Sequence, residues 1–227
     1  MLTMFYTDWN KSTFDEEAIG LLFPESIQLE IKKYKNNSAA KAALYGKLLL
    51  LAGLTYFNYP RQTIDSYQRT ADGRPYLSAM ALDFNISHSG NLVVIAFSDG
   101  RVGLDIEEVS MLPFEDFDRV FDSEEWKYIG QDPGFFFQFW TIKEAVMKAD
   151  GRGFGLDPRQ ISIDLTLRQA KSDKKQWYYH TIEIDTGYIL NVVLDKPWNR
   201  EDLSVARVDG ISANTLSKNM NMNLTWL

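Results

Sequence analysis

Two carboxylates stand two residues apart in the segment Asp105-Ile106-Glu107. On a β-strand, residues i and i+2 point to the same face, so both acids would share one face while Ile106 packs on the other. Adjacent carboxylates raise each other's pKa unless a cation lies between them. Mg²⁺ prefers a few carboxylates together with phosphate oxygens and water. The pair therefore predicts a metal site, although two acids at the exposed end of a hairpin would give the same pattern.

A second candidate group lies on a predicted helix over 135–150. Trp140, Glu144 and Lys148 are spaced i, i+4, i+8, so a helix places them in one row that offers an acid and a base. An apolar stripe on another face predicts contact with a core; it contains Phe135, Phe139, Ile142, Val146 and Ala149. On spacing alone, Glu144 and Lys148 are typical of a surface salt bridge. Lys143 lies about 100° round the helix from Glu144, and we expect it to face solvent or an anion.

The segment Ser87-His88-Ser89-Gly90 follows a predicted strand. An imidazole in a turn of small residues can offer donors to a phosphate, although a single loop histidine is more often a plain surface residue. No carboxylate–His–Ser arrangement supports Ser87 or Ser89 as a hydrolase nucleophile. The sequence also lacks the G-x-S-x-G elbow and the G-x-x-x-x-G-K-[ST] phosphate loop.

The composition limits the classes of protein and of site. The 227 residues contain no cysteine, which excludes disulfides and thiolate metal sites, and only two histidines, His88 and His180. A metal would therefore be bound by oxygen. The net charge of −7 argues against a nucleic-acid binder. Because the sequence has no apolar run of about 18 residues and no secretory signal at its start, we expect a cytoplasmic protein with no membrane contact.

The periodicity predicts helices and strands in two successive groups. Helices are expected over 24–35, 39–51, 114–121, 123–128 and 135–150, with Gly53 ending the second, Ser123 capping the fourth, and a further helical stretch over 212–220. Strands are expected over 2–7, 63–70, 84–87, 92–98, 102–107, 161–165, 177–185, 188–194 and 203–208. Asp99-Gly100 is a hairpin signal that would pair the strands 92–98 and 102–107. Since helices then strands occur twice, over about 1–109 and 110–227, we predict an α+β protein of two similar-sized lobes with its site between them.

Three blocks become specific when their order and spacing are taken together. FNISHSG at 84–90, VGLDIE at 102–107 and FWTIKEAVMK at 139–148 resemble the signature blocks of 4′-phosphopantetheinyl transferases of the Sfp (surfactin-synthetase-activating) type. Gly73-Arg74-Pro75 resembles a turn of the same family, and the resemblance covers about residues 73–155. It implies a pseudo-symmetric fold of two lobes. It also implies an enzyme that transfers the phosphopantetheine arm of coenzyme A (CoA) to a serine of an apo carrier protein and releases 3′,5′-ADP.

The resemblance further implies roles for single residues. Asp105, Glu107 and Glu144 would ligate Mg²⁺, or Mn²⁺, at the CoA pyrophosphate. The residues that would line CoA are Gly73, Arg74, Pro75, Ser87, His88 and Lys148. Lys148 would assist the leaving group, and Glu144 would be the general base, directly or through a water. Lys41 stands near the position of an arginine that the family uses for the CoA 3′-phosphate, with Lys32, Lys33 and Lys35 nearby.

The partner implied by the resemblance is a carrier protein, and carriers are usually acidic. This chain is acidic too, so docking would need a local basic patch or an apolar surface. Met111, Phe114, Phe117 and Phe121 fall at near-helical spacing, and they are either core residues or part of that surface. Two other interpretations stay open, namely a non-catalytic module that binds CoA or a carrier, and another Mg²⁺-dependent enzyme that cleaves a pyrophosphate. The two-lobe length suggests a monomer.

Overall fold

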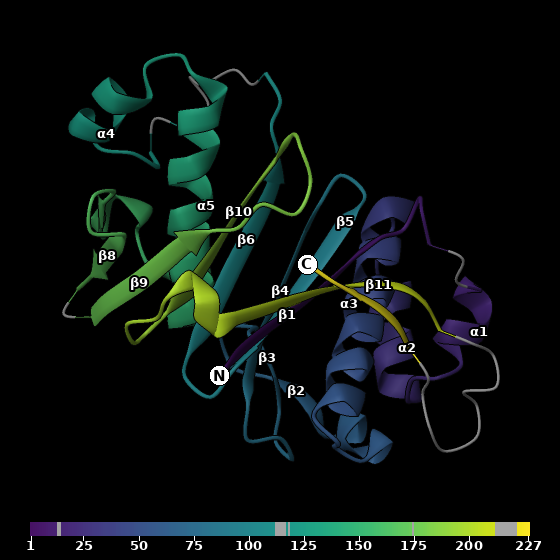
Figure 1. Cartoon of the computed structure of the whole chain (residues 1–227). Coiled ribbons are helices and arrows are strands. Elements are labelled where there is room, and N and C mark those ends of the chain that lie inside the picture. The colour runs from purple at the N-terminus through teal and green to yellow at the C-terminus, as the bar shows by residue number, and fades with distance from the viewer. Residues whose placement is uncertain (13–14, 112–116, 118, 174, 212–221) are drawn as a thin grey trace.

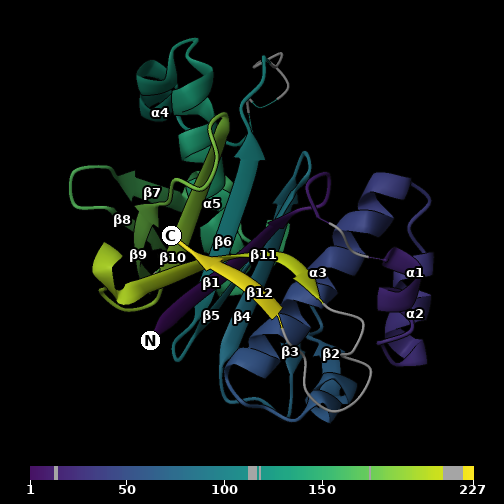
Figure 2. The same ribbon diagram turned by 45° about the vertical axis from the view of Figure 1, so that its right-hand side comes forward.

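The computed structural model describes residues 1–12, 15–111, 117, 119–173, 175–211 and 222–227. Two five-stranded sheets share an apolar layer at the centre of the molecule, and one long helix covers the outer face of each sheet (Figures 1 and 2). The helices are α1 Glu16–Gly20, α2 Glu25–Lys32, α3 Asn37–Tyr56, α4 Ser123–Ile129 and α5 Pro133–Asp150. This arrangement confirms the predicted α+β fold of two similar lobes.

The first sheet has the strand order β12-β11-β1-β5-β4. Its strands are β1 Leu2–Asp8, β4 Asp83–Ser89, β5 Leu92–Ser98, β11 Leu203–Ile211 and β12 Met222–Trp226. Both faces of β1 are buried, because Phe5 packs toward α3 while Met4 and Tyr6 enter the layer shared with the second sheet. A two-stranded ribbon, β2 Tyr67–Arg69 with β3 Pro75–Leu77, lies beside this sheet (Figure 2).

The second sheet has the order β6-β10-β9-β8-β7. Its strands are β6 Val102–Glu108, β7 Ile161–Asp164, β8 Gln169–Ser172, β9 Lys175–Thr181 and β10 Tyr188–Leu194. Leu104 and Ile106 of β6 enter the layer between the sheets, and the alternation of a strand therefore turns Gly103, Asp105 and Glu107 toward α5. The predicted shared face of the two carboxylates is thus the face that the helix covers.

The hairpin predicted at Asp99-Gly100 is wrong. The strand β6 does not pair with β5; it pairs antiparallel with β10, with Asp105 opposite Asn191. The turn therefore carries the chain from the first sheet to the second. The predicted lobe limits, 1–109 and 110–227, stay a prediction, but strand pairing groups β6 with the second sheet and returns β11 and β12 to the first.

Other predicted elements differ at single residues. The stretch 63–70 is mostly a 3₁₀ helix, Arg61–Ser66, followed by the short β2. Gly53 lies inside α3 instead of ending it. A glycine is needed there because a Cβ would collide with the ring of Phe97. The cap of α4 is Asp122, which forms a capping box with Glu125. The predicted helix at 212–220 and half of the one at 114–121 lie outside the described residues, and the described half, Phe117 and 119–121, contains no α-helix. The remaining strands and helices are confirmed apart from their ends. Within the described ranges, no helix is both long and apolar enough to cross a bilayer.

Gly103 sets how closely α5 approaches β6. A Cβ at this position would overlap the carbonyl oxygen of Ala145 and lie 2.6 Å from the backbone nitrogen of Ala149. We expect Gly103→Ala to lower the free energy of unfolding by at least about 2 kcal/mol, because the added Cβ would force the backbone of α5 away from β6. Urea denaturation followed by circular dichroism measures it. Gly20→Ala is the matched control, since nothing lies within 4 Å of its Cβ; equal losses in both variants would contradict the close-approach argument.

Candidate active site

The two carboxylates of β6 are held by hydroxyls from β4. Ser87 Oγ lies 2.8 Å from Asp105 Oδ1, and Ser89 Oγ lies 2.7 Å from Glu107 Oε2. Asp105 is 3% exposed, and no described residue donates to its Oδ2. Burial, with the nearby charge of Asp105, raises the pKa of the Glu107 carboxyl. One buried oxygen of Asp105 therefore has no hydrogen-bond partner among the described residues.

The row predicted on α5 faces these carboxylates. Lys148 Nζ lies 2.5 Å from Asp105 Oδ1 and 2.8 Å from Ser87 Oγ, and Trp140 Nε1 lies 3.4 Å from Glu107 Oε1. Burial raises the pKa of Glu144 to about 7; Lys148 opposes the shift, and the charges of Asp105 and Glu107 add to it. The ammonium of Lys148 is thus an internal counter-ion for Asp105, and the plain surface salt bridge that spacing alone suggested does not describe it.

The site crosses from one sheet to the other through side chains. Asp83 Oδ2 and Asn85 Oδ1 accept the backbone N–H groups of Val102 and Leu104, each at 2.9 Å. Together with Ser87 and Ser89 they form a series of alternate residues on β4 that reaches β6 without a backbone ladder between the two strands. The sequence prediction missed Asp83 and Asn85 as positioning groups, although their period-two spacing with the serines was a usable signal.

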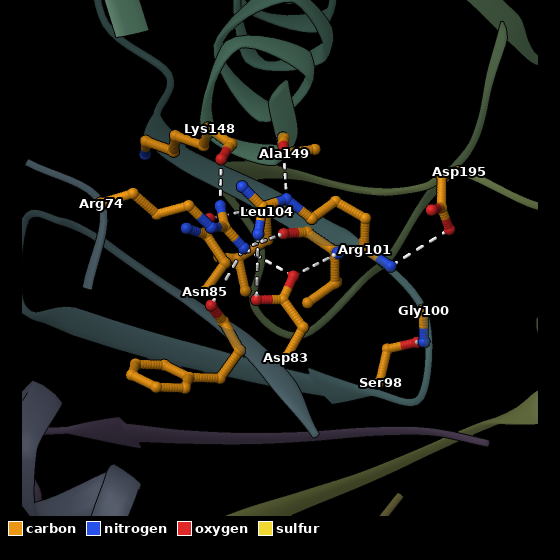
Figure 3. Close-up of polar contacts among 12 residues, drawn as sticks. Arg74, Asp83, Asn85, Ser98, Gly100, Arg101, Leu104, Lys148, Ala149 and Asp195 are labelled. Carbon is orange, nitrogen blue, oxygen red and sulfur yellow. Dashed lines mark hydrogen bonds and ion pairs between the residues drawn. The ribbon is translucent and has the colours of Figure 1, made fainter. Parts of the chain in front are cut away.

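Arg74 ties the end of α5 to both sheets (Figure 3). Its Nη1 donates to the carbonyl of Lys148, and its Nη2 lies 2.7 Å from Asp83 Oδ2 and 2.8 Å from the carbonyl of Val102. Arg101 reaches the same helix end, with Nε 2.8 Å from the carbonyl of Ala149. Because the buried Arg74 guanidinium already holds these groups, its contacts are those of a structural tie, and its predicted role in binding CoA stays a prediction.

The remaining residues predicted to line CoA lie apart from the carboxylates or at their edge. Gly73 is in the predicted turn, with a φ of +86° that favours glycine, and Pro75 begins β3. His88 is exposed on β4 next to Ser87. Lys41 pairs with Glu16, with Nζ 2.9 Å from Oε1. Partial burial and the charge of Lys148 lower the pKa of the His88 imidazole, while Asp105 opposes the shift, so His88 lies at the edge of the carboxylate site. The parts of all these residues in binding CoA stay a prediction. The side chains of Lys32, Lys33 and Lys35 are exposed.

Of the two surroundings predicted for Lys143, solvent or an anion, solvent is wrong, and the anion that it faces is the carboxylate of Glu125 within the chain. The side chain of Lys143 is fully buried, and Nζ lies 2.8 Å from Glu125 Oε2 and 2.7 Å from the carbonyl of Pro158. No local pattern indicates this environment, because neither partner stands one helical turn away from Lys143 in the sequence. Phe135, assigned to the apolar stripe, is 40% exposed and packs against Tyr128 instead of the core.

A cavity of about 290 Å³ opens beside the carboxylate of Glu107. It is lined by Ser89, Glu107, Glu108, Ser110, Phe117, Phe136, Phe137 and Trp140. Of the predicted docking residues, Phe117 lines this cavity, Phe121 is buried, Met111 is 82% exposed and Phe114 lies outside the described residues. A larger cavity of about 620 Å³ lies across α5 near His180, away from the carboxylates, so the smaller one is relevant to the chemistry.

The described residues contain no group of three His, Cys, Asp or Glu side chains already arranged to hold a metal ion. The lysine contact gives a physical reason, since the Lys148 ammonium occupies the Asp105 oxygen on one side. The chemistry nevertheless suits a hard cation. Asp105, Glu107 and Glu144 supply only carboxylate oxygens. Burial, with the charges of Asp105 and Glu107, raises the pKa of Glu144, and Oδ2 of Asp105 has no partner among the described residues.

Comparison with known proteins agrees with this geometry. A family model of the 4′-phosphopantetheinyl transferase superfamily matches residues 101–193, and one of the 4′-phosphopantetheinyl transferase N-terminal region matches residues 7–99. The sequence is 31% identical over 153 residues to the 4′-phosphopantetheinyl transferase gsp of Aneurinibacillus migulanus, covering 63% of this chain and 64% of that protein.

Two other relatives extend the match. The L-aminoadipate-semialdehyde dehydrogenase-phosphopantetheinyl transferase of Pongo abelii is 30% identical over 219 residues, which cover 78% of this chain and 70% of that protein. The 4′-phosphopantetheinyl transferase Sfp of Bacillus subtilis (strain 168) is 25% identical over 203 residues, covering 84% of this chain and 90% of that protein. The two family-model matches include strands of both sheets, and every residue of the carboxylate site lies within their ranges.

Proposed function

The chain belongs to the 4′-phosphopantetheinyl transferase superfamily, whose members transfer phosphopantetheine to carrier proteins, and we propose that it moves the 4′-phosphopantetheine of CoA to a serine of an apo carrier protein, releasing 3′,5′-ADP. The observation that carries the proposal is the Lys148 ammonium of α5, which lies 2.5 Å from Asp105 Oδ1 of β6. Glu144 lies on the same helix, where burial and the charges of Asp105 and Glu107 raise its pKa. An ammonium beside a set of carboxylates suits a reaction at a pyrophosphate, because the phosphate oxygens need cations and the attacking hydroxyl needs a positioned base.

In this reaction the serine oxygen forms a bond to the phosphorus that carries the pantetheine. The bond from that phosphorus to the bridging oxygen breaks, and 3′,5′-ADP leaves with the electron pair. Glu144 orients the serine hydroxyl and accepts its proton, directly or through a water. Lys148 moves from Asp105 to the phosphate oxygens and stabilises the charge that develops on the leaving group.

Asp105, Glu107 and Glu144 are the residues that would hold Mg²⁺, or Mn²⁺, in this proposal. When bound, such an ion neutralises charge on the pyrophosphate oxygens. The open Oδ2 of Asp105 and the all-oxygen donor set support this choice. A carboxylate that also binds a cation is a weak base, so Glu144 contributes by positioning the serine as much as by its affinity for the proton.

Incubation with CoA, Mg²⁺ and an apo carrier protein, followed by mass spectrometry of the carrier, tests the proposal. We expect the carrier to gain the mass of one phosphopantetheine arm, and Glu144→Gln to lower the turnover by about 10²–10⁴-fold through loss of the base. CoA cleavage with no modified carrier would support the pyrophosphate-cleaving alternative, and binding without turnover would support the non-catalytic module. Glu144→Gln with full turnover and unchanged metal affinity would remove Glu144 from the mechanism.

The raised pKa of Glu144 predicts a pH-dependent metal affinity. Below about pH 7 this carboxyl is protonated in the metal-free protein, so a metal ion must displace a proton to bind. We expect the Mn²⁺ affinity of the CoA-free protein to fall about tenfold per pH unit below 7 and to level off at higher pH. Titration calorimetry in buffers of different ionisation enthalpy measures the released proton. Glu144→Gln corrects for protons released elsewhere in the protein, and equal proton release in both proteins would contradict the assignment.

A further inference from the structure

Ser89, at the end of β4, makes two hydrogen bonds that together fix its hydroxyl. Its Oγ lies 2.7 Å from Glu107 Oε2, and the backbone nitrogen of Glu108 lies 3.0 Å from the same Oγ. Neither bond follows from the pairing of strands within a sheet, because β4 and β6 belong to different sheets. Ser89 of β4 therefore holds two neighbouring residues of β6 in the second sheet, the carboxylate of Glu107 and the backbone N–H of Glu108.

The direction of these bonds is set by chemistry. A hydroxyl has one proton and two lone pairs, whereas a backbone N–H can only donate. The N–H of Glu108 therefore occupies a lone pair of Ser89, and the single proton of the hydroxyl is directed to Glu107 Oε2. Ser87, two residues earlier on β4, has the same arrangement. Lys148 donates to the oxygen of Ser87, and the hydroxyl proton of Ser87 is directed to Asp105 Oδ1.

The second oxygen of Glu107 is held much less firmly. Its only described donor is Trp140 Nε1 at 3.4 Å, close to the limit of a hydrogen bond. Oε2 of Glu107 is thus fixed by a short bond from Ser89. Oε1 can leave its weak contact with Trp140 and bind a cation instead. Hydrogen bonds that orient a ligating carboxylate in this way commonly change metal affinity by about 10–100-fold.

We propose that Ser89 is a positioning residue that orients the Glu107 carboxylate for the divalent cation of the transfer reaction, an inference that rests on the proposed function. Ser89 acts through Glu107. Its backbone-anchored hydroxyl removes the rotational freedom of a glutamate side chain, which would otherwise have to be lost when the cation binds. The sequence places the pair in two separate blocks, and only the alignment of β4 beside β6 brings them together.

The test compares Mn²⁺ binding, in the presence of CoA, by the full chain and three variants. Ser89→Ala removes the hydroxyl, Ser89→Thr keeps it, and Ser98→Ala is the matched control. Ser98 lies on β5, is fully buried and accepts one backbone N–H, from Gly100 at 3.0 Å, away from the carboxylates. Electron paramagnetic resonance of Mn²⁺ gives the affinity, and thermal unfolding confirms that each protein is folded.

We expect Ser89→Ala to weaken Mn²⁺ binding by about 10–100-fold, Ser89→Thr to restore most of it, and Ser98→Ala to leave it within about twofold. In the carrier assay, Ser89→Ala should raise the metal concentration for half-maximal rate more than it lowers kcat. Should Ser89→Ala fail to fold, Ser89→Cys keeps the shape with a weaker donor, and its affinity should fall in the same direction.

Two results would overturn the inference, namely Ser89→Ala (or Ser89→Cys in its place) binding Mn²⁺ as tightly as the unmodified protein, or Ser98→Ala losing as much affinity as Ser89→Ala. Failure of the proposed function gives a different result. In that case the unmodified protein would bind no Mn²⁺ with CoA and would modify no carrier, whereas failure of the Ser89 inference alone leaves both properties intact.

Discussion

Lys148→Met is expected to lower carrier modification by about 10²–10³-fold while tightening Mn²⁺ binding to the protein without CoA. The two effects have one cause. In the structure the Lys148 ammonium lies 2.5 Å from Asp105 Oδ1 and 2.8 Å from Ser87 Oγ, so it neutralises a carboxylate that the metal would use. Removing the ammonium leaves the carboxylates of Asp105, Glu107 and Glu144 without their counter-ion. Their attraction for a divalent cation therefore increases.

The loss of turnover follows from the other role of the same group. In the proposed reaction, the bound pyrophosphate would offer the ammonium a better anion than Asp105, and the ammonium would stabilise charge on the leaving group. Methionine has a similar length and no charge, so it separates packing from electrostatics. We expect Mn²⁺ to bind the CoA-free variant at least about tenfold more tightly, because a full unit charge a few ångströms away has been removed.

Lys127→Met is the control for removal of a positive charge. Lys127 pairs with Glu124 on the exposed surface of α4, and both side chains are more than 70% exposed. Its loss should change neither turnover nor Mn²⁺ affinity by more than about twofold, since exposed pairs contribute little. Mn²⁺ binding that is unchanged in CoA-free Lys148→Met would show that the lysine does not compete with the cation for Asp105.

The sequence predicted the parts of this site that depend on local periodicity. The row Trp140, Glu144 and Lys148 needs only a helix, and the pair Asp105 and Glu107 needs only a strand, so spacing placed both correctly relative to their own elements. The strand partner of β6 was not predictable in this way. Asp99-Gly100 is a true local turn signal, but β10, some eighty residues later, competes for the same strand and pairs with it.

The environments of Arg74 and Lys143 were missed for the same physical reason. A charged residue in a short motif is naturally assigned to a ligand, because most charged side chains are exposed. Arg74 instead bonds to a carbonyl on α5 and to Asp83, and Lys143 bonds to Glu125 and two carbonyls near the start of β7. Those partners come together only in the folded chain, and no spacing rule along the sequence connects them.

The buried pair of Lys143 and Glu125 should have the largest effect on stability. Lys143 Nζ lies 2.8 Å from Glu125 Oε2, 2.7 Å from the carbonyl of Pro158 and 3.0 Å from that of Ile161. Burial lowers the pKa of Lys143 and raises that of Glu125, and each partner opposes the shift of the other. The pair thus remains charged only because its members neutralise one another.

Lys143→Met is expected to lower the free energy of unfolding by about 3–5 kcal/mol, because it leaves a buried carboxylate and two carbonyls without their donor. Urea denaturation measures the loss, and Lys127→Met, on the exposed face of α4, should stay within about 0.5 kcal/mol of the unmodified protein. A loss below about 1 kcal/mol for Lys143→Met would mean that solvent reaches the site and that the pair is not buried in solution.

The double variant Lys143→Met with Glu125→Leu separates the two parts of that loss. If an unpaired carboxylate is the main cost, removing it should recover part of the stability, and the double variant should be more stable than the sum of the two single losses predicts. Recovery will be incomplete, because Glu125 also closes the capping box of α4 and the carbonyls of Pro158 and Ile161 stay without their donor. Strict additivity would instead assign the loss to those carbonyls and to packing, since it would show that the two charges do not interact.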